Sequence, residues 1–295
     1  MVVKGIIINN VSNMYQVEVG NKIINCNARG KLKNEDIVPV VGDLVEIEII
    51  DEEKLLGIIN NIQDRENYIK RPKMANLSQI IFVVSIKMPK TDLLLLDKQI
   101  AYAEYKGIKP IICINKIDLD EEKLADKIED TYKNIGYEVI RTVANQGRGV
   151  DSIIDILKNN ITAFSGNSGV GKSSLINSLF SDNLTKEGLI SDKNKRGKNT
   201  TTSIKLYKID DNSYIADTPG FSSFEINEIE TKDLYKYFRE FKEYDNTCEF
   251  VGCSHIKEEK CGIKQALEEG KISKDRYERY CKIYNELKNK EARRW

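Results

Sequence analysis

The sequence predicts an α/β protein of several domains: a small antiparallel β-barrel, then a doubly wound and mostly parallel sheet, then a helical region. Three observations favour this class. Apolar and polar residues alternate in short runs over the first 65 residues. From Gln79 onward the pattern predicts strands that alternate with helices. After Phe224 the pattern is helical and charged, and it is interrupted by a compact group of cysteines. A length of 295 residues allows two compact domains or three small ones.

The composition excludes several classes of function. Lys and Arg together number 46, and so do Asp and Glu, so a polyanionic partner has to be met by a local patch and not by the overall charge. The chain holds one histidine, His255, which excludes mechanisms that need two imidazoles. Six cysteines without a leader segment indicate a cytoplasmic protein. The longest apolar stretches are far shorter than the roughly 18 residues of a membrane span, so we expect no membrane partner.

Five short runs in which apolar and polar residues alternate predict five strands and an OB-like β-barrel over residues 1–68. Turn residues separate the runs, which cover 3–8, 15–19, 22–26, 44–50 and 55–62. Residues 1–70 carry 8 basic and 11 acidic side chains, so a contact with RNA would have to use one face or the loops. The alternative is a barrel that only spaces or docks other domains.

After the barrel the pattern changes to strands that are apolar throughout. Residues 80–86 and 111–114 are continuous apolar runs, as expected for strands buried on both faces. Helical spacing follows them at 92–105 and 121–135. This alternation predicts a doubly wound sheet whose ligand crevice lies at the carboxyl ends of the strands.

A glycine-rich segment follows the predicted strand at 162–165. Its sequence, GNSGVGKSS, has the G-x-x-x-x-G-K-[ST] pattern of a nucleotide-binding loop and leads into a helix. In such a loop the backbone N–H groups surround phosphate oxygens, Lys172 neutralises the β- and γ-phosphates, and Ser173 ligates Mg²⁺. The predicted binding residues are Gly166, Asn167, Ser168, Gly169, Val170, Gly171, Lys172, Ser173 and Ser174.

The segment Asn115, Lys116, Ile117 and Asp118 ends the second central strand and has the N-K-x-D pattern. A carboxylate at Asp118 can accept from both N1–H and the 2-amino group of guanine, whereas N1 of adenine is itself an acceptor. Alone, the pattern could be a helix-capping loop, but beside a phosphate-binding loop it argues for guanine. Residues 143–145, after the third strand, remain open as a loop under the base.

Two further segments predict a site for magnesium and the γ-phosphate. Asp217 and Gly220 bound a D-x-x-G turn, where the carboxylate acts on Mg²⁺ through water and the glycine amide meets the γ-phosphate. The basic stretch 193–198 leads to threonines at 200–202; one can complete the Mg²⁺ shell, and we favour Thr201, although a plain loop is the alternative. The predicted catalytic groups are Lys172, Thr201, Asp217 and Gly220, and the predicted magnesium ligands are Ser173 and Thr201.

The order of these motifs indicates a circular permutation. In Ras-like GTPases the phosphate-binding loop comes first and N-K-x-D comes late, whereas here N-K-x-D at 115 precedes the loop at 166 and D-x-x-G at 217. Loops at the carboxyl ends of one sheet still meet after a permutation. We therefore predict a circularly permuted P-loop GTPase domain at 69–225, which uses magnesium with GTP.

The C-terminal domain, predicted at 226–295, combines helices with a group of metal-ligating side chains. Helical spacing covers 231–244 and 263–269, and Ser273 can cap a last helix. Three cysteines and the single histidine fall within fourteen positions, in C-x4-C-x-H-x5-C spacing. Such a set suits one tetrahedral zinc ion and leaves no open position for catalysis. The predicted zinc ligands are Cys248, Cys253, His255 and Cys261, while Cys26, Cys113 and Cys281 are interpreted as buried thiols.

With these motifs the chain resembles the RsgA family, also called YjeQ or YloQ, of small ribosomal subunit biogenesis GTPases. The resemblance covers the barrel, the motifs NKID, GNSGVGKSS, KRGKNTTT and DTPGF, and the zinc module. It implies a cytoplasmic GTPase, expected to be a monomer, that binds the 30S ribosomal subunit with its 16S rRNA and proteins late in maturation. Its hydrolysis of GTP to GDP would be stimulated by the subunit and coupled to release.

Two departures bear on the chemistry. Family members often have a histidine before the three threonines, a candidate for positioning the attacking water, and this chain has Asn199. Ras-like proteins have glutamine after D-x-x-G, and this chain has Phe221. Since an amide cannot take a proton near neutral pH, we expect slow hydrolysis until a ribosomal partner completes the site, with no histidine at the nucleotide. The rival interpretations are an RNA-binding adaptor that does not need GTP and an ATP-driven P-loop enzyme.

Overall fold

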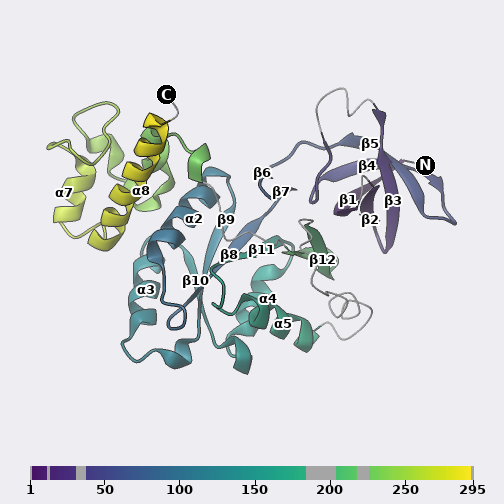
Figure 1. Ribbon diagram of the computed structural model, residues 1–295, viewed down its shortest axis with the longest axis horizontal. Helices are drawn as coiled ribbons and strands as arrows, with labels where there is room; N and C mark the ends of the chain where they lie inside the picture. Colours follow the sequence, from purple (N-terminus) through teal and green to yellow (C-terminus); the bar gives the residue numbers. More distant parts are fainter. Residues whose placement is uncertain (1, 12–13, 31–37, 184–203, 218–225, 294–295) are drawn as a thin grey trace.

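The computed structural model of the protein has three parts that follow one another along the chain (Figure 1). The structure describes residues 2–11, 14–30, 38–183, 204–217 and 226–293. A barrel of short strands is followed by a sheet with helices on both faces and then by a helical region, which confirms the predicted fold class. Within these residues, no helix has the length and apolar character needed to cross a membrane.

In the described residues, five strands close the N-terminal barrel. They are β1 (Val2–Val11), β2 (Met14–Val19), β3 (Lys22–Ala28), β4 (Leu44–Asp51) and β5 (Leu56–Ile62). Strand β1 pairs with β2 and β4, β2 pairs with β3, β3 pairs in parallel with β5, and β5 pairs with β4, so the ladder returns to its start. The inward side chains, such as Val17, Val45 and Ile59, are completely buried, as the alternating pattern predicts.

The described part of the central sheet has six strands. They are β8 (Gln79–Ser85), β9 (Lys109–Asn115), β10 (Glu138–Thr142), β11 (Ile161–Ser165), β12 (Lys205–Asp210) and β13 (Ser213–Asp217). Their order across the sheet is β10-β9-β8-β11-β13-β12. The neighbours run parallel except β12, which is antiparallel to β13. The carboxyl ends of the parallel strands therefore lie along one edge of the sheet.

Helices cover both faces of this sheet, and the central strand β8 shows why. All seven of its residues are buried. Ile80 and Phe82 belong to a core with the helices α2 (Leu93–Tyr105) and α3 (Leu124–Lys133). Ile81 and Val83 belong to a second core with α4 (Val150–Leu157) and α5 (Lys172–Asn183). Because successive side chains of a strand point to opposite faces, an apolar run without alternation requires this two-sided cover.

The C-terminal region contains α7 (Gly262–Glu268) and α8 (Lys274–Ala292) beside short 3-10 helices. The prediction of a single helix at 231–244 is wrong, because the chain forms two 3-10 helices there, η4 (Thr231–Tyr237) and η5 (Arg239–Phe241). Between them Phe238 is extended and completely buried, with its ring 5.1 Å from that of Tyr280 on α8. Tertiary packing of this ring therefore overrides the local helical pattern. The region also contains the short 3-10 helices η3 (Ile226–Glu228) and η6 (Asp245–Thr247).

The barrel and the central sheet are joined directly. Strand β1 pairs with β12 at Asn9 and Lys205, so the strands of both parts form one continuous sheet. The Glu18 carboxylate accepts hydrogen bonds from Lys208 Nζ at 2.7 Å and from the Tyr214 hydroxyl at 3.0 Å. A short hairpin, β6 (Tyr68–Lys70) and β7 (Lys73–Ala75), lies between the two parts (Figure 1).

A buried ion-pair network holds the C-terminal region against α2. The Arg276 guanidinium, 1% exposed, donates to Asp97 at 2.6 Å and also to Glu240. Asp97 accepts further bonds from Arg279 and from the Tyr132 hydroxyl, the latter at 2.6 Å. Burial alone would lower the pKa of Arg276, but the neighbouring carboxylates raise it well above its usual range. The guanidinium therefore stays charged inside the protein.

Replacing Arg276 by Leu should destabilise the protein strongly. The substitution leaves Glu240 buried without its partner, and breaking a buried ion pair from one side costs about 3–5 kcal/mol. Urea unfolding followed by circular dichroism measures this loss. Lys232→Gln, which breaks an exposed ion pair with Glu230, is the control. A loss for Arg276→Leu no larger than that of the control would contradict the expectation.

Candidate nucleotide site and metal centre

The glycine-rich loop connects the end of β11 to the start of α5, as predicted. Two of its glycines are required by the backbone. Gly166 and Gly171 have φ angles of 144° and 101°, which favour glycine. A Cβ at Gly166 would collide with the Val83 carbonyl, and one at Gly171 would collide with the side chain of Asn115. The loop is therefore packed directly on the carboxyl ends of β8 and β9.

The side chain of Asn115 joins three loops. Its Nδ2 donates to the Val170 carbonyl of the glycine-rich loop at 2.9 Å. Its Oδ1 accepts from the Thr142 hydroxyl and from the backbone N–H of Ala144, each at 3.0 Å. The residue is 2% exposed, so these bonds replace all of its hydration. The N-K-x-D segment and the glycine-rich loop, predicted to meet at one sheet edge, are thus in contact.

Lys116 and Asp118 extend this contact toward the open side of the site. Lys116 Nζ donates to the Gly169 carbonyl at 2.8 Å and to the carbonyl of Met88. Asp118 lies in the short 3-10 helix η1 (Ile117–Leu119) and is exposed. An exposed carboxylate at this position can accept two parallel hydrogen bonds from a base edge.

The segment 143–145, left open by the sequence, is held against the site. Residues 144–146 form the 3-10 helix η2 (Ala144–Gln146). The Ala144 N–H donates to Asn115, and its carbonyl accepts from the Ser178 hydroxyl of α5 at 2.8 Å. This segment therefore belongs to the same group of loops.

Lys172 lies across the glycine-rich loop. Its Nζ donates to the carbonyls of Gly166 and Asn167, the latter at 2.8 Å. Burial lowers the pKa of this ammonium group. Ser173 and Ser174 are exposed in the first turn of α5. Backbone N–H groups, a helix N-terminus and one ammonium group make this loop suited to bind phosphate.

Asp217 ends β13 at the same sheet edge. Ala216, directly before it, is the register partner of Ala163 on β11, two residues before Ser165. The other predicted switch residues lie outside the described part of the chain. These are Asn199, Thr200, Thr201, Thr202, Gly220 and Phe221, together with the basic stretch 193–198.

The sequence did not lead us to predict a role for Gln99, whose side chain contacts the residue that directly precedes the glycine-rich loop. Its Nε2 donates to the Ser165 hydroxyl at 3.2 Å, and the side chain is 3% exposed. Ser165 directly precedes Gly166. The available signal was a polar residue within the apolar stripe of α2, between Leu96 and Ile100.

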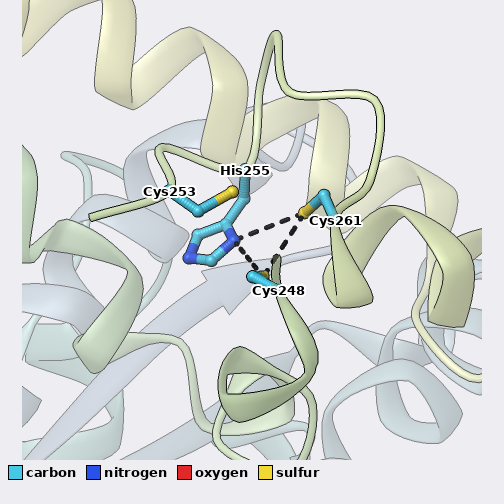
Figure 2. Close-up of side chains that lie close together, drawn as sticks. All are labelled: Cys248, Cys253, His255 and Cys261. Carbon is cyan, nitrogen blue, oxygen red and sulfur yellow. Dashed lines mark hydrogen bonds between the residues drawn. The ribbon is translucent and has the colours of Figure 1, made fainter. Parts of the chain in front are cut away.

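The predicted zinc ligands come together in the C-terminal region (Figure 2). Their ligand atoms all lie within 4.8 Å of one another. Cys248 Sγ lies 3.9 Å from Cys261 Sγ, and His255 Nδ1 lies 3.5 and 3.4 Å from these two sulfurs. A tetrahedral zinc ion at usual bond lengths requires about 3.8 Å between two sulfurs and about 3.6 Å between sulfur and nitrogen. The four donors therefore fit zinc in their chemistry, and Cys248, His255 and Cys261 also fit it in their spacing.

The surrounding residues fix the loop that carries these ligands. The Tyr277 and Tyr280 hydroxyls of α8 donate to the carbonyls of His255 and Ser254 at 2.7 and 2.8 Å. The Glu258 carboxylate accepts from its own backbone N–H, from the N–H groups of Ser254 and Ile256 and from the Ser254 hydroxyl, and despite the effect of burial these bonds lower its pKa to about 2. Burial raises the pKa of Cys253 to about 12 and lowers that of His255. A cation bound at the cluster would stabilise the thiolate forms of the cysteines and so offset the unfavourable burial of their charge.

Comparison with known proteins agrees with these motifs. The family model described as RsgA N-terminal domain matches residues 4–59, and the model described as RsgA GTPase matches residues 62–227. Proteins named small ribosomal subunit biogenesis GTPase RsgA are similar over nearly the whole chain. The protein from Clostridium botulinum is 42% identical over 99% of this chain and 100% of its own length. That from Caldanaerobacter subterraneus subsp. tengcongensis is 39% identical over 99% and 98%.

Two solved structures share the whole architecture. YjeQ from Thermotoga maritima has a TM-score of 0.85 and 37% identity, covering 97% of this chain and 99% of the other. YloQ, described as a circularly permuted GTPase, has a TM-score of 0.80 and 34% identity, with 98% and 96% covered. The predicted family, fold and enzyme class are therefore confirmed. The chain is a circularly permuted GTPase that belongs to the RsgA family.

Proposed function

We propose that this protein is an assembly factor that binds the 30S ribosomal subunit late in its maturation. The subunit stimulates GTP hydrolysis, and hydrolysis is coupled to release. The observation that carries the proposal is the likeness over the whole length to proteins named small ribosomal subunit biogenesis GTPase. On this proposal the protein works as a monomer in the cytoplasm, where subunits and GTP are available.

The nucleotide lies, on this proposal, where the described loops meet. The backbone of residues 166–174 and Lys172 hold its phosphates, supported by the packing of this loop on Asn115. Asp118 selects guanine through two hydrogen bonds. Ser173 and Thr201 ligate Mg²⁺, Asp217 acts on it through water, and the Gly220 amide meets the γ-phosphate.

Hydrolysis without a partner should be slow, because the residues at the usual water-positioning places cannot take a proton from the attacking water. The single histidine of the chain, His255, belongs to the metal cluster with Cys248, Cys253 and Cys261. Asn199 and Phe221 stand where a histidine or glutamine would orient water in related GTPases. We infer that ribosomal RNA or protein completes the site by reordering residues 193–202.

The cysteine cluster holds, on this proposal, one structural zinc ion. Four protein ligands fill a tetrahedral shell, so the ion has no open position for catalysis. The ion would tie Cys248, at the end of η6, to Cys261, at the start of α7. It would thereby fix a loop that contains few buried apolar residues of its own.

Purified 30S subunits should raise the rate of GTP turnover well above that of the protein alone. The physical reason is that neither Asn199 nor Phe221 can take a proton from the attacking water, so the partner has to complete the site. The measurement is phosphate release at saturating GTP with 30S subunits, with 50S subunits, and without either. Lys172→Ala should be inactive in all three conditions. Equal rates with and without 30S subunits would refute the proposal.

Asp118→Asn should reduce GTP affinity by about 10- to 100-fold, because hydrogen bonds to a charged group contribute about 1.5–3 kcal/mol. The variant should gain affinity for xanthosine triphosphate, whose ring has an oxygen in place of the 2-amino group of guanine. Competition titrations with GTP, ATP and xanthosine triphosphate test this.

Asp120→Asn is the matched control for this titration. The Asp120 carboxylate accepts from the N–H groups of Leu124 and Ala125 at 2.9 and 2.8 Å and so serves the start of α3. This variant should keep the preference for GTP. Wild-type protein that binds ATP as tightly as GTP would contradict the role of Asp118.

Purified protein should contain one equivalent of zinc, and Cys261→Ser should lose it. Cys281→Ser is the control, because Cys281 is a half-buried thiol outside the cluster. Atomic emission gives the zinc content, and thermal unfolding gives the stability. We expect a lower unfolding temperature for Cys261→Ser only. Full zinc content in Cys261→Ser would exclude this site.

A further inference from the structure

The tip of the β6–β7 hairpin gathers positive charge. Residues 68–75 contain Lys70, Arg71 and Lys73 and no acidic residue, although the barrel before them is acidic overall. All three side chains are exposed. Within the part of the chain that the structure describes, none of the three makes a side-chain ion pair or hydrogen bond. The nearby cation Arg65 differs, because it is bound to the buried Asp43 at 2.7 and 2.9 Å.

The arrangement of these cations lowers the stability of the hairpin that carries them. Lys70 and Lys73 are register partners, so their side chains lie on the same face directly opposite each other. Like charges at such a pair are destabilising. Each strand has only three residues, and an isolated two-stranded hairpin is marginal in water. The charges at the tip therefore work against folding.

The base of the hairpin is nevertheless held firmly. Ile69 and Met74, the next register pair, are completely buried in the core that includes barrel and central-sheet residues. The Asn76 side chain donates to the Gly42 carbonyl at 3.0 Å. Asn67 exchanges two hydrogen bonds with the backbone of Leu77, at 2.9 and 3.0 Å. These contacts fix the hairpin that carries the three cations, between the barrel and the central sheet (Figure 1).

We propose that the hairpin tip, Lys70, Arg71 and Lys73, binds the phosphate backbone of RNA. This inference rests on the proposed function and assigns a contact of the protein with 16S rRNA. Phosphates would remove the repulsion between the two opposed lysines. A protein partner is less well matched, because lysine is depleted at protein interfaces and the tip offers no exposed apolar side chain. Lys and Arg are instead the usual phosphate ligands in nucleic-acid complexes.

The first test neutralises the tip in the variant Lys70→Gln/Arg71→Gln/Lys73→Gln. Binding to 30S subunits is measured from low to moderate salt. Losing three phosphate contacts should make the slope of log affinity against log salt shallower by about 2–3. The control, Lys158→Gln/Lys232→Gln/Lys271→Gln, removes the same charge from lysines that are already paired with carboxylates. It should keep the wild-type slope, and GTP turnover without subunits should be unchanged in both variants.

Hydroxyl-radical footprinting of 16S rRNA in the complex identifies the class of partner. Wild-type protein and the control should protect a backbone segment that the tip variant leaves exposed. Weaker binding by the tip variant with an unchanged footprint would assign the tip to a protein and overturn the inference. If wild-type protein does not bind 30S subunits, the proposed function fails and this inference with it. If it binds and the tip variant keeps its slope and footprint, only this inference fails.

A single substitution separates binding from folding. Lys70→Glu places opposite charges at the register pair, which should leave the unfolding temperature unchanged or raise it. The same change should weaken 30S binding and remove the footprint, since it puts a negative charge against phosphate. Stability and affinity then move in opposite directions. Wild-type affinity in Lys70→Glu would overturn the inference.

Discussion

The buried side-chain amide of Asn115 is the contact on which the nucleotide site depends. It links the ends of β9 and β10, the η2 helix and the glycine-rich loop through three hydrogen bonds. In a permuted chain these loops are separated by up to 55 residues, and chain connectivity alone does not align them. Because the amide is almost fully buried, losing any of these bonds would leave an unsatisfied polar group. Parallel strands bring the loops to one edge, and Asn115 then sets their mutual positions.

The two flanking parts are attached to elements next to this site. On one side, α2 connects the C-terminal region to the glycine-rich loop: Asp97 binds Arg276, and Gln99, two residues later, binds Ser165. On the other side, β12 pairs with the barrel strand β1 and with β13, which ends at Asp217. The three parts are therefore joined by direct contacts and not only by the chain that connects them. Each flanking part contacts an element that carries or supports a nucleotide-site residue.

Much of this arrangement follows from local sequence patterns. The apolar run at 80–86 predicts a strand buried on both faces, and the spacing of Cys248, Cys253, His255 and Cys261 predicts their convergence, which the structure confirms. What the sequence does not reveal is long-range pairing. Arg276 and Asp97 are 179 residues apart, and Tyr214 and Glu18 are 196 apart, so no periodicity connects them. The incorrect helix at 231–244 has the same cause, since the burial of Phe238 against α8 decides the local backbone.

The continuous sheet also bears on solubility. A closed barrel has no free strand edge, so the outer strands of the described sheet are β10 and, beyond its single register pair with the barrel, β12. Strand β10 carries Glu138 and Arg141 along this edge, whereas on β12 Lys205 is the register partner of Asn9 and Lys208 binds Glu18 of the barrel. Charged side chains on an edge strand disfavour pairing with a second molecule. The protein can thus expose the β10 edge at high concentration with little tendency to form intermolecular sheets.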